Sequence, residues 1–142
     1  MREHFINAPL TCDHSSVVYA LMNTSNRKIY IGKTDDFSQR IKYHWYALKA
    51  QKHSIKELQE DFDSGHRFLV ICLRRVATRN SITKNRPTRD TDRWLSLLEK
   101  EYIQEFQAVE FGYNRKEPAY PLRSEPHLRP FEALAETNSE AV

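Results

Sequence analysis

Two short segments with strand-like composition, separated by a run of turn-forming residues, constrain the fold of this chain most strongly. Residues 16–22 (SVVYALM) and 28–32 (KIYIG) are rich in β-branched and aromatic residues, which favour strands. Residues 23–27 (NTSNR) between them are typical of a turn. The pattern predicts an antiparallel hairpin, with Gly32 at the end of its second strand.

Hydrophobic spacing after the hairpin predicts a helix. Asp35 or Asp36 can cap its start, and apolar residues three and four positions apart continue to about Gln51. The same spacing places Arg40 and His44 on one helical face. A cationic side chain and an imidazole are therefore expected close together, soon after the hairpin.

Two further helices and a third strand are predicted downstream. Ser54 and Glu57 form the pattern of a capping box for a helix that ends at Gly65, and residues 67–76 are an apolar run of strand length. Residues 90–106 form a long amphipathic pattern. Its predicted buried stripe consists of Trp94, Leu97, Leu98, Tyr102 and Phe106. These elements predict an α/β (α+β) fold, with a small, mostly antiparallel three-stranded sheet flanked by helices.

The length of 142 residues and the hydrophobic fraction of 39% fit a single globular domain. We expect an N-terminal extension, a core domain with a basic insertion, and a proline-containing tail. The predicted boundaries are 1–15 for the extension, 16–115 for the domain with its insertion at about 77–91, and 116–142 for the tail. Because the sequence shows neither a long apolar run nor a secretory pattern, a membrane protein is disfavoured and a cytoplasmic location is expected.

Basic residues are concentrated in one part of the chain. Between His66 and Arg93 there are eight basic and two acidic residues, a difference of +6. Such a segment is either a solvated loop or an arm that neutralises DNA phosphates, and the arm predicts binding that weakens with salt. It lacks aromatic platforms for single strands, which favours duplex DNA. The predicted DNA-binding residues are Arg74, Arg75, Arg79, Lys84, Arg86, Arg89 and His53.

The tyrosines of the hairpin belong to a longer ordered pattern. Its elements are VVY with Tyr19, YIG with Tyr30, then Arg40 and His44, KHSIKELQEDF around His53, LEKEYIQEF with Glu99, and FGYN with Asn114. This order, over roughly residues 16–115, resembles the GIY-YIG nuclease family. The chain departs from the family pattern at Val17, where the first motif begins with glycine, and at Tyr102, where tryptophan is common.

The resemblance implies a DNA endonuclease that leaves a 5′ phosphate and a 3′ hydroxyl. By this resemblance, Tyr19 is the general base for the attacking water, and Tyr30 is a positioning group or an alternative base. Tyrosine has an ordinary pKa near 10, so neighbouring positive charge must acidify it before it can act as a base. Lys33, Arg40 and a metal ion would supply that charge.

The resemblance also implies roles for four residues outside the strands. Arg40 would neutralise the scissile phosphate, and His44 would hydrogen-bond a tyrosine or the phosphate. Glu99 would hold one divalent cation, Mg²⁺ or alternatively Mn²⁺. Asn114 would orient the phosphate or a metal-bound water.

Each of these residues taken alone has a simpler interpretation. Strands favour aromatic residues, so the tyrosines fit a hydrophobic core. Helical charged residues such as Arg40 and Glu99 usually face solvent, and Asn114 fits a turn. The ordered set as a whole favours the nuclease.

Duplex DNA is the expected partner of this chain. Since one active site cuts one strand, a double-strand break would require a homo-oligomer or successive nicks. Two other functions remain open: a non-catalytic nucleic-acid-binding module of the same fold, and an interaction protein that uses its acidic last helix. Metal-dependent nicking distinguishes the first from a nuclease, and salt-sensitive DNA binding distinguishes the second.

Overall fold

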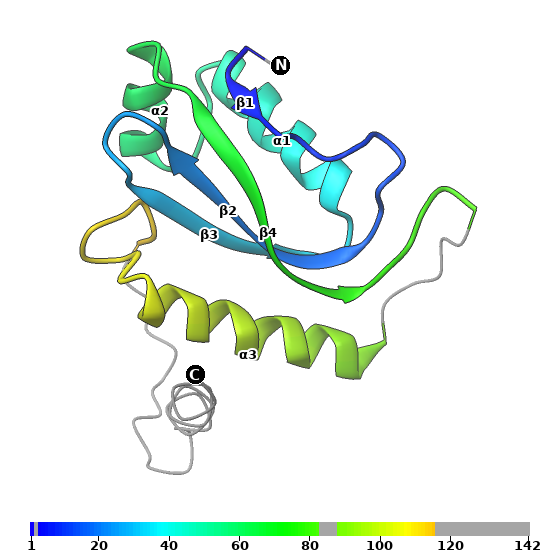
Figure 1. Ribbon diagram of the computed structural model, residues 1–142. Coiled ribbons are helices and arrows are strands. Elements are labelled where there is room, and N and C mark those ends of the chain that lie inside the picture. Colours follow the sequence, from blue (N-terminus) through cyan, green and yellow to red (C-terminus); the bar gives the residue numbers. More distant parts are fainter. Residues whose placement is uncertain (2, 83–87, 116–142) are drawn as a thin grey trace.

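The computed structural model describes residues 1, 3–82 and 88–115 (Figure 1). The described strands form one four-stranded sheet in the order β1-β4-β2-β3. The elements in chain order are β1 (Phe5–Ile6), β2 (Ser16–Asn23), β3 (Ile29–Thr34), α1 (Phe37–Lys49), α2 (Lys56–Asp63), β4 (Phe68–Ala77) and α3 (Arg89–Glu105). The predicted α/β class is confirmed, but the sheet has one more strand than expected. The additional strand, β1, is a two-residue segment that pairs parallel with β4 and is too short to show an alternating pattern.

The predicted hairpin is formed by β2 and β3, and Tyr19 of β2 lies opposite Gly32 of β3. Because β2 also pairs antiparallel with β4, it is an internal strand, whereas β3 lies at the edge of the sheet. The expectation that the second strand ends at Gly32 is wrong. Pairing continues to Thr34, which lies opposite Val17.

The sheet lies between α1 and α2 on one side and α3 on the other (Figure 1), and it separates two hydrophobic clusters. Successive residues of a strand point to opposite faces, so Tyr19 packs in the cluster shared with α1 and α2. Its neighbour Val18 packs in the cluster shared with α3. Two helices therefore cover one face of the sheet and α3 covers the other.

The starts of the first two helices differ in how they are capped. Asp36 caps α1 by accepting a hydrogen bond from a backbone N–H of the first turn, as expected. In α2 the N-cap is Ile55, and no side chain caps the helix, so the capping box predicted at Ser54 is wrong. The Ile55 N–H donates to Nδ1 of His53 at 3.1 Å, and the Ile55 side chain packs against the core. These contacts keep the chain extended through Ile55.

The buried stripe of α3 is rotated relative to the prediction. Leu95 and Leu98 are buried, whereas Trp94 and Phe106 are 38% and 43% exposed. Spacings of three and four residues can begin equally well at position 94 or 95, so the helical period alone does not fix which side faces the sheet. Within the described residues, no helix is long and apolar enough to cross a membrane.

Candidate active site

Most of the predicted site residues gather around the edge strand β3. Tyr30 lies on this strand, and its ring centroid is 6.3 Å from that of Tyr19 on β2. The charges of Arg40 from α1 and Glu99 from α3 both act on the pKa values of the two tyrosines. Because α1 and α3 cover opposite faces of the sheet, these two charged side chains approach each other around its edge.

Gly32 provides the space through which Tyr19 reaches this edge. A Cβ atom on residue 32 would lie 2.5 Å from the Tyr19 hydroxyl oxygen and 2.6 Å from its Cζ. Such contacts are far inside van der Waals distance, so no side chain fits here beside the phenol. From the sequence, Gly32 is expected only to end a strand. Its position opposite a tyrosine in the predicted hairpin could have indicated that Gly32 makes room for that ring.

Tyr19 is hydrogen-bonded to His44. Its hydroxyl oxygen lies 2.6 Å from His44 Nε2, and both side chains are buried. The contact is one of the two expected for this histidine. The His44 ring also lies edge-on to Tyr30, with centroids 5.5 Å apart. One imidazole therefore contacts both tyrosines of the motif.

A second histidine, His53, is hydrogen-bonded to His44 and determines which atom donates in the hydrogen bond between His44 and Tyr19. His44 Nδ1 lies 2.9 Å from His53 Nε2, and His53 Nδ1 accepts the backbone N–H of Ile55. In neutral His53 the proton is therefore on Nε2, which donates to His44 Nδ1. Neutral His44 then carries its proton on Nε2 and donates it to the oxygen of Tyr19. The backbone N–H of Ile55 thus sets the direction of both hydrogen bonds, from His53 to His44 and from His44 to Tyr19.

The pKa values of both histidines agree with this neutral chain. Burial, His53 and Arg40 together lower the pKa of His44 to about 3. Burial, with help from Arg115, also lowers the pKa of His53. From the sequence, His53 is predicted to contact DNA. Its link to His44 is not visible there, because no helical or strand period relates two residues in separate segments.

Neither tyrosine has a lowered pKa in the protein alone. Burial raises the pKa of Tyr19. The nearby Tyr30 and Glu99 add to this rise, and Arg40 opposes it. Burial also raises the pKa of Tyr30. Both phenols therefore keep their protons at neutral pH. Additional positive charge near Glu99 would lower the pKa of both tyrosines, as Arg40 does.

Glu99 presents a partly buried carboxylate beside basic groups. Burial raises its pKa, while Lys33, Lys100 and Arg40 oppose the rise. The Lys33 ammonium donates to Ser96 Oγ at 2.5 Å, which holds it on the same helix as Glu99. In the described part of the chain, no group of three or more His, Cys, Asp or Glu could hold a metal ion. A single carboxylate fits Mg²⁺ or Mn²⁺, because Mg²⁺ in particular keeps several water and phosphate ligands.

Asn114 lies at the same edge, where its amide bonds to the protein backbone. Its Oδ1 accepts the N–H of Ile31, and its Nδ2 donates to the Ile31 carbonyl, both at 2.8 Å. The N–H of Tyr113 also donates to the carbonyl of Ile29 at 2.9 Å. The segment after α3 therefore holds β3 from its outer side. These contacts make Asn114 a positioning residue for β3, and its contact with phosphate stays a prediction.

Arg75 and Arg79, both predicted to bind DNA, make polar contacts within the protein. Arg75 Nη1 lies 3.0 Å from each carboxylate oxygen of Asp13. Arg79 Nη2 donates to Ser16 Oγ at 2.6 Å and to the carbonyl of Asp35. These contacts fasten the end of β4 and the start of the basic loop to the rest of the domain.

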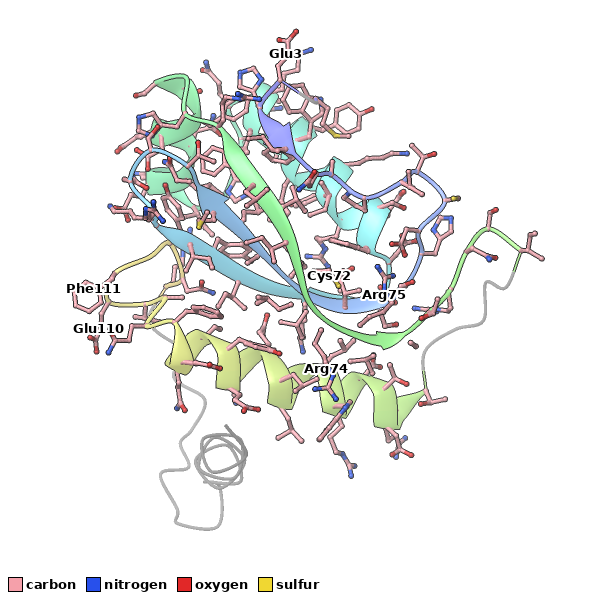
Figure 2. The ribbon with its side chains drawn as sticks, in the orientation of Figure 1. Glu3, Cys72, Arg74, Arg75, Glu110 and Phe111 are labelled. Carbon is pink, nitrogen blue, oxygen red and sulfur yellow. The ribbon has the colours of Figure 1, made fainter. Side chains whose placement is uncertain are left out.

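The other predicted DNA-binding residues are spread over the molecule. Arg74 lies on the side of β4 that faces α3 (Figure 2), and Arg89 is exposed at the start of α3. His53 is in the histidine chain. Lys84 and Arg86 lie outside the described residues.

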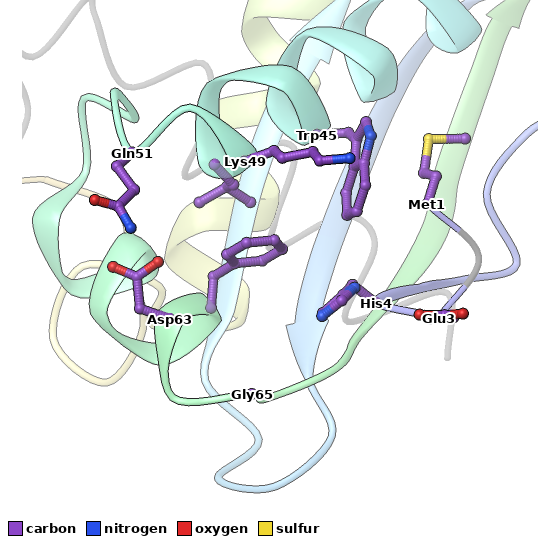
Figure 3. Close-up of a pocket in the computed structure, with 10 residues that line it drawn as sticks. Met1, Glu3, His4, Trp45, Lys49, Gln51, Asp63 and Gly65 are labelled. Atoms are coloured by element: carbon purple, nitrogen blue, oxygen red, sulfur yellow. The ribbon is translucent and has the colours of Figure 1, made fainter.

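A separate cavity of about 720 Å³ lies on the other side of α1, between the N-terminal segment and α2 (Figure 3). His4, Trp45 and Phe62 contribute aromatic rings to its wall. None of the predicted site residues lines it. The candidate active site is therefore the edge of β3, where the chemically competent side chains meet.

Comparison with known proteins identifies the family of this chain. Residues 15–114 match the GIY-YIG catalytic domain. This chain belongs to the GIY-YIG family. The predicted resemblance is confirmed, and the fold is that of an endonuclease catalytic domain.

Individual GIY-YIG relatives support the assignment. A mutant of the catalytic domain of intron endonuclease I-TevI has a TM-score of 0.59 and 26% identity, over 75% of this chain and 98% of that one. A second structure of the I-TevI catalytic domain gives 0.57 and 27%, over 72% and 99% of the two chains. A stretch of 48 residues is 40% identical to Intron-associated endonuclease 1 of Enterobacteria phage T4. That stretch is 34% of this chain and 20% of the phage protein, so the match spans about a fifth of that relative.

Proposed function

We propose that this chain is a divalent-metal-dependent DNA endonuclease that hydrolyses phosphodiester bonds in duplex DNA, leaving a 5′ phosphate and a 3′ hydroxyl. The observation that carries the proposal is the hydrogen-bonded chain from His53 through His44 to Tyr19, which ends beside Arg40 and Glu99. Phosphodiester hydrolysis needs a base, positive charge at the phosphate, and help for the departing oxygen. The edge of β3 offers groups for each of these tasks.

Tyr19 is the proposed general base. The His44 Nε2–H donates to its oxygen, and such a donor favours the phenolate over the phenol. Once ionised, Tyr19 would take a proton from the water that attacks phosphorus. Tyr30 would position this water, or take the proton in its place. Since burial raises the pKa of both phenols, ionisation would need more positive charge near them, which a metal ion held at Glu99 would supply.

Arg40 and Glu99 would handle the charge of the reacting phosphate. The Arg40 guanidinium presents a planar set of donors that suits the scissile phosphate. Glu99 would hold one Mg²⁺ or Mn²⁺ ion, which when bound offsets negative charge on the phosphate and leaving oxygen. Lys33, held by Ser96, keeps further positive charge beside this carboxylate.

The proposed DNA surface combines this edge with the basic segment after β4. Arg74 and Arg89 would contact phosphates directly, and we include Lys84 and Arg86 on the basis of their sequence. Arg75 and Arg79 would shape the loop through their protein contacts, and their contacts with DNA stay a prediction. A cytoplasmic location, and a homo-oligomer for double-strand cleavage, belong to the same proposal.

A supercoiled-plasmid assay tests the function. We expect nicking or linearisation with Mg²⁺, none with EDTA, and none by Glu99→Ala, which should still shift DNA on a gel. Glu105→Ala removes an exposed carboxylate from the same helix and should cleave normally. Cleavage by Glu99→Ala would contradict the metal role. DNA binding without cleavage by the unsubstituted protein would instead favour a non-catalytic binding module.

A further inference from the structure

The outward face of α1 carries two large exposed aromatic side chains. Tyr43 is 63% exposed and Tyr46 is 65% exposed. Residues three positions apart are neighbours on a helix surface, so the two phenols belong to one patch. Adjacent exposed aromatic residues mark a candidate contact surface rather than a packed core.

Tyr43 also adjoins the candidate active site. Its ring centroid is 6.0 Å from Cζ of Arg40 and 6.1 Å from the centroid of the His44 ring. Since Arg40 is proposed to bind the scissile phosphate, a nucleotide next to that phosphate would lie against the Tyr43 ring. The patch therefore begins where the reacting part of the substrate would be.

The charge of α1 favours a polyanion as the partner of this patch. The helix contains Arg40, Lys42 and Lys49 and no acidic residue. Asp36, directly before the helix, caps its first turn and lies 2.9 Å from His14 Nδ1. On this face Arg40 offers a cation for a phosphate beside aromatic rings for bases, the combination used to bind unpaired nucleic-acid strands.

We infer that Tyr43 and Tyr46 stack on unpaired bases, so that the preferred substrate is duplex DNA interrupted by unpaired nucleotides beside the scissile phosphate. In an intact duplex the faces of the bases are covered by their neighbours, and a protein ring can cover a base face only where that base is unstacked. The inference rests on the proposed function. It narrows the substrate from duplex DNA in general to duplex DNA with a local gap or bulge.

Binding measurements with the Glu99→Ala protein test this inference without cleavage. Two labelled DNAs of the same sequence would be compared, one fully paired and one with a short single-stranded gap. We expect the gapped DNA to bind about tenfold more tightly, the order expected for one stacked base. Adding Tyr43→Ala should remove most of this preference and Tyr46→Ala part of it, whereas Tyr43→Phe keeps the ring and should retain it.

Phe111→Ala is the matched control. Phe111 is 67% exposed and lies in the segment after α3, not on α1 (Figure 2), so its loss should leave the preference for gapped DNA unchanged. Equal binding of gapped and paired DNA, or equal weakening of both by Tyr43→Ala, would overturn the inference. In either case plasmid cleavage by the unsubstituted protein would still support the proposed function. If the Glu99→Ala protein bound neither DNA, both this inference and the proposed function would be overturned.

Discussion

The hydroxyl oxygen of Tyr19 lies 2.6 Å from Nε2 of His44, and both side chains are buried. This contact ties the internal strand β2 to α1, and His53 extends it to the segment before α2. The protein therefore fixes the orientation of the candidate base before any substrate binds.

Replacing Tyr19 with phenylalanine removes the hydroxyl but keeps the buried ring. We expect Tyr19→Phe to fold normally, to bind DNA, and to cleave about 10²–10⁴ times more slowly, the usual contribution of a general base. Single-turnover cleavage and a gel shift would measure the two effects. If Tyr30→Phe caused the larger loss of rate, the base role would pass to Tyr30.

Adding a methyl group at Gly32 should displace the Tyr19 phenol. In Gly32→Ala the new Cβ would collide with the ring, so we expect a loss of about 1–3 kcal/mol in the free energy of unfolding, as for overpacked sites, together with loss of cleavage. Gly65→Ala is the control. Gly65 has φ +90° but no atom near its missing Cβ, so alanine there should cost roughly 1–2 kcal/mol through backbone strain and leave cleavage intact. Urea unfolding and plasmid assays would show whether activity separates the two variants.

Removing the His53 ring should act on catalysis through His44. In His53→Ala, His44 Nδ1 loses its donor and the tautomer of His44 is no longer fixed. We expect kcat to fall about 10–100-fold, as for other partners that orient a functional imidazole, with KM nearly unchanged. His53→Gln keeps an N–H donor and should recover part of the rate. A rise in KM at constant kcat would instead support the DNA contact predicted for His53 from the sequence.

The stability of the protein should fall as the pH is lowered from 6.5 towards 3. His44 has an ordinary pKa near 6.5 in the unfolded chain and about 3 when folded, so between these values the unfolded chain binds the additional proton. The free energy of unfolding then decreases with falling pH, by at most about 1.4 kcal/mol per pH unit for this one group. Urea titrations across this range would measure the slope. His44→Gln should flatten it, and an unchanged slope would show that other groups control acid stability.

Much of the fold could be predicted from local patterns in the sequence. Alternation in residues 16–22 and 28–32 corresponds to β2 and β3, and an acidic cap followed by helical spacing corresponds to α1. These features depend on neighbouring residues, whose preferences are visible within one segment. Strand β1 escaped prediction because its pairing with β4, and not its own two residues, makes it a strand.

The candidate site was predictable as a set of residues but not as an arrangement. The order of Tyr19, Tyr30, Arg40, His44 and Glu99 along the chain was sufficient to indicate the GIY-YIG family. The sequence did not show that β3 is an edge strand, around which residues from both faces of the sheet can meet.

Local patterns in the sequence indicate most of the elements and the residue types of the site. Three contacts emerge only when the chain is folded: the Tyr19 phenol passes over Gly32, His53 sets the tautomer of His44, and Asn114 bonds to β3. Each of these contacts joins residues in separate segments. Their geometry depends on how strands pair and helices pack, and no local periodicity carries that information.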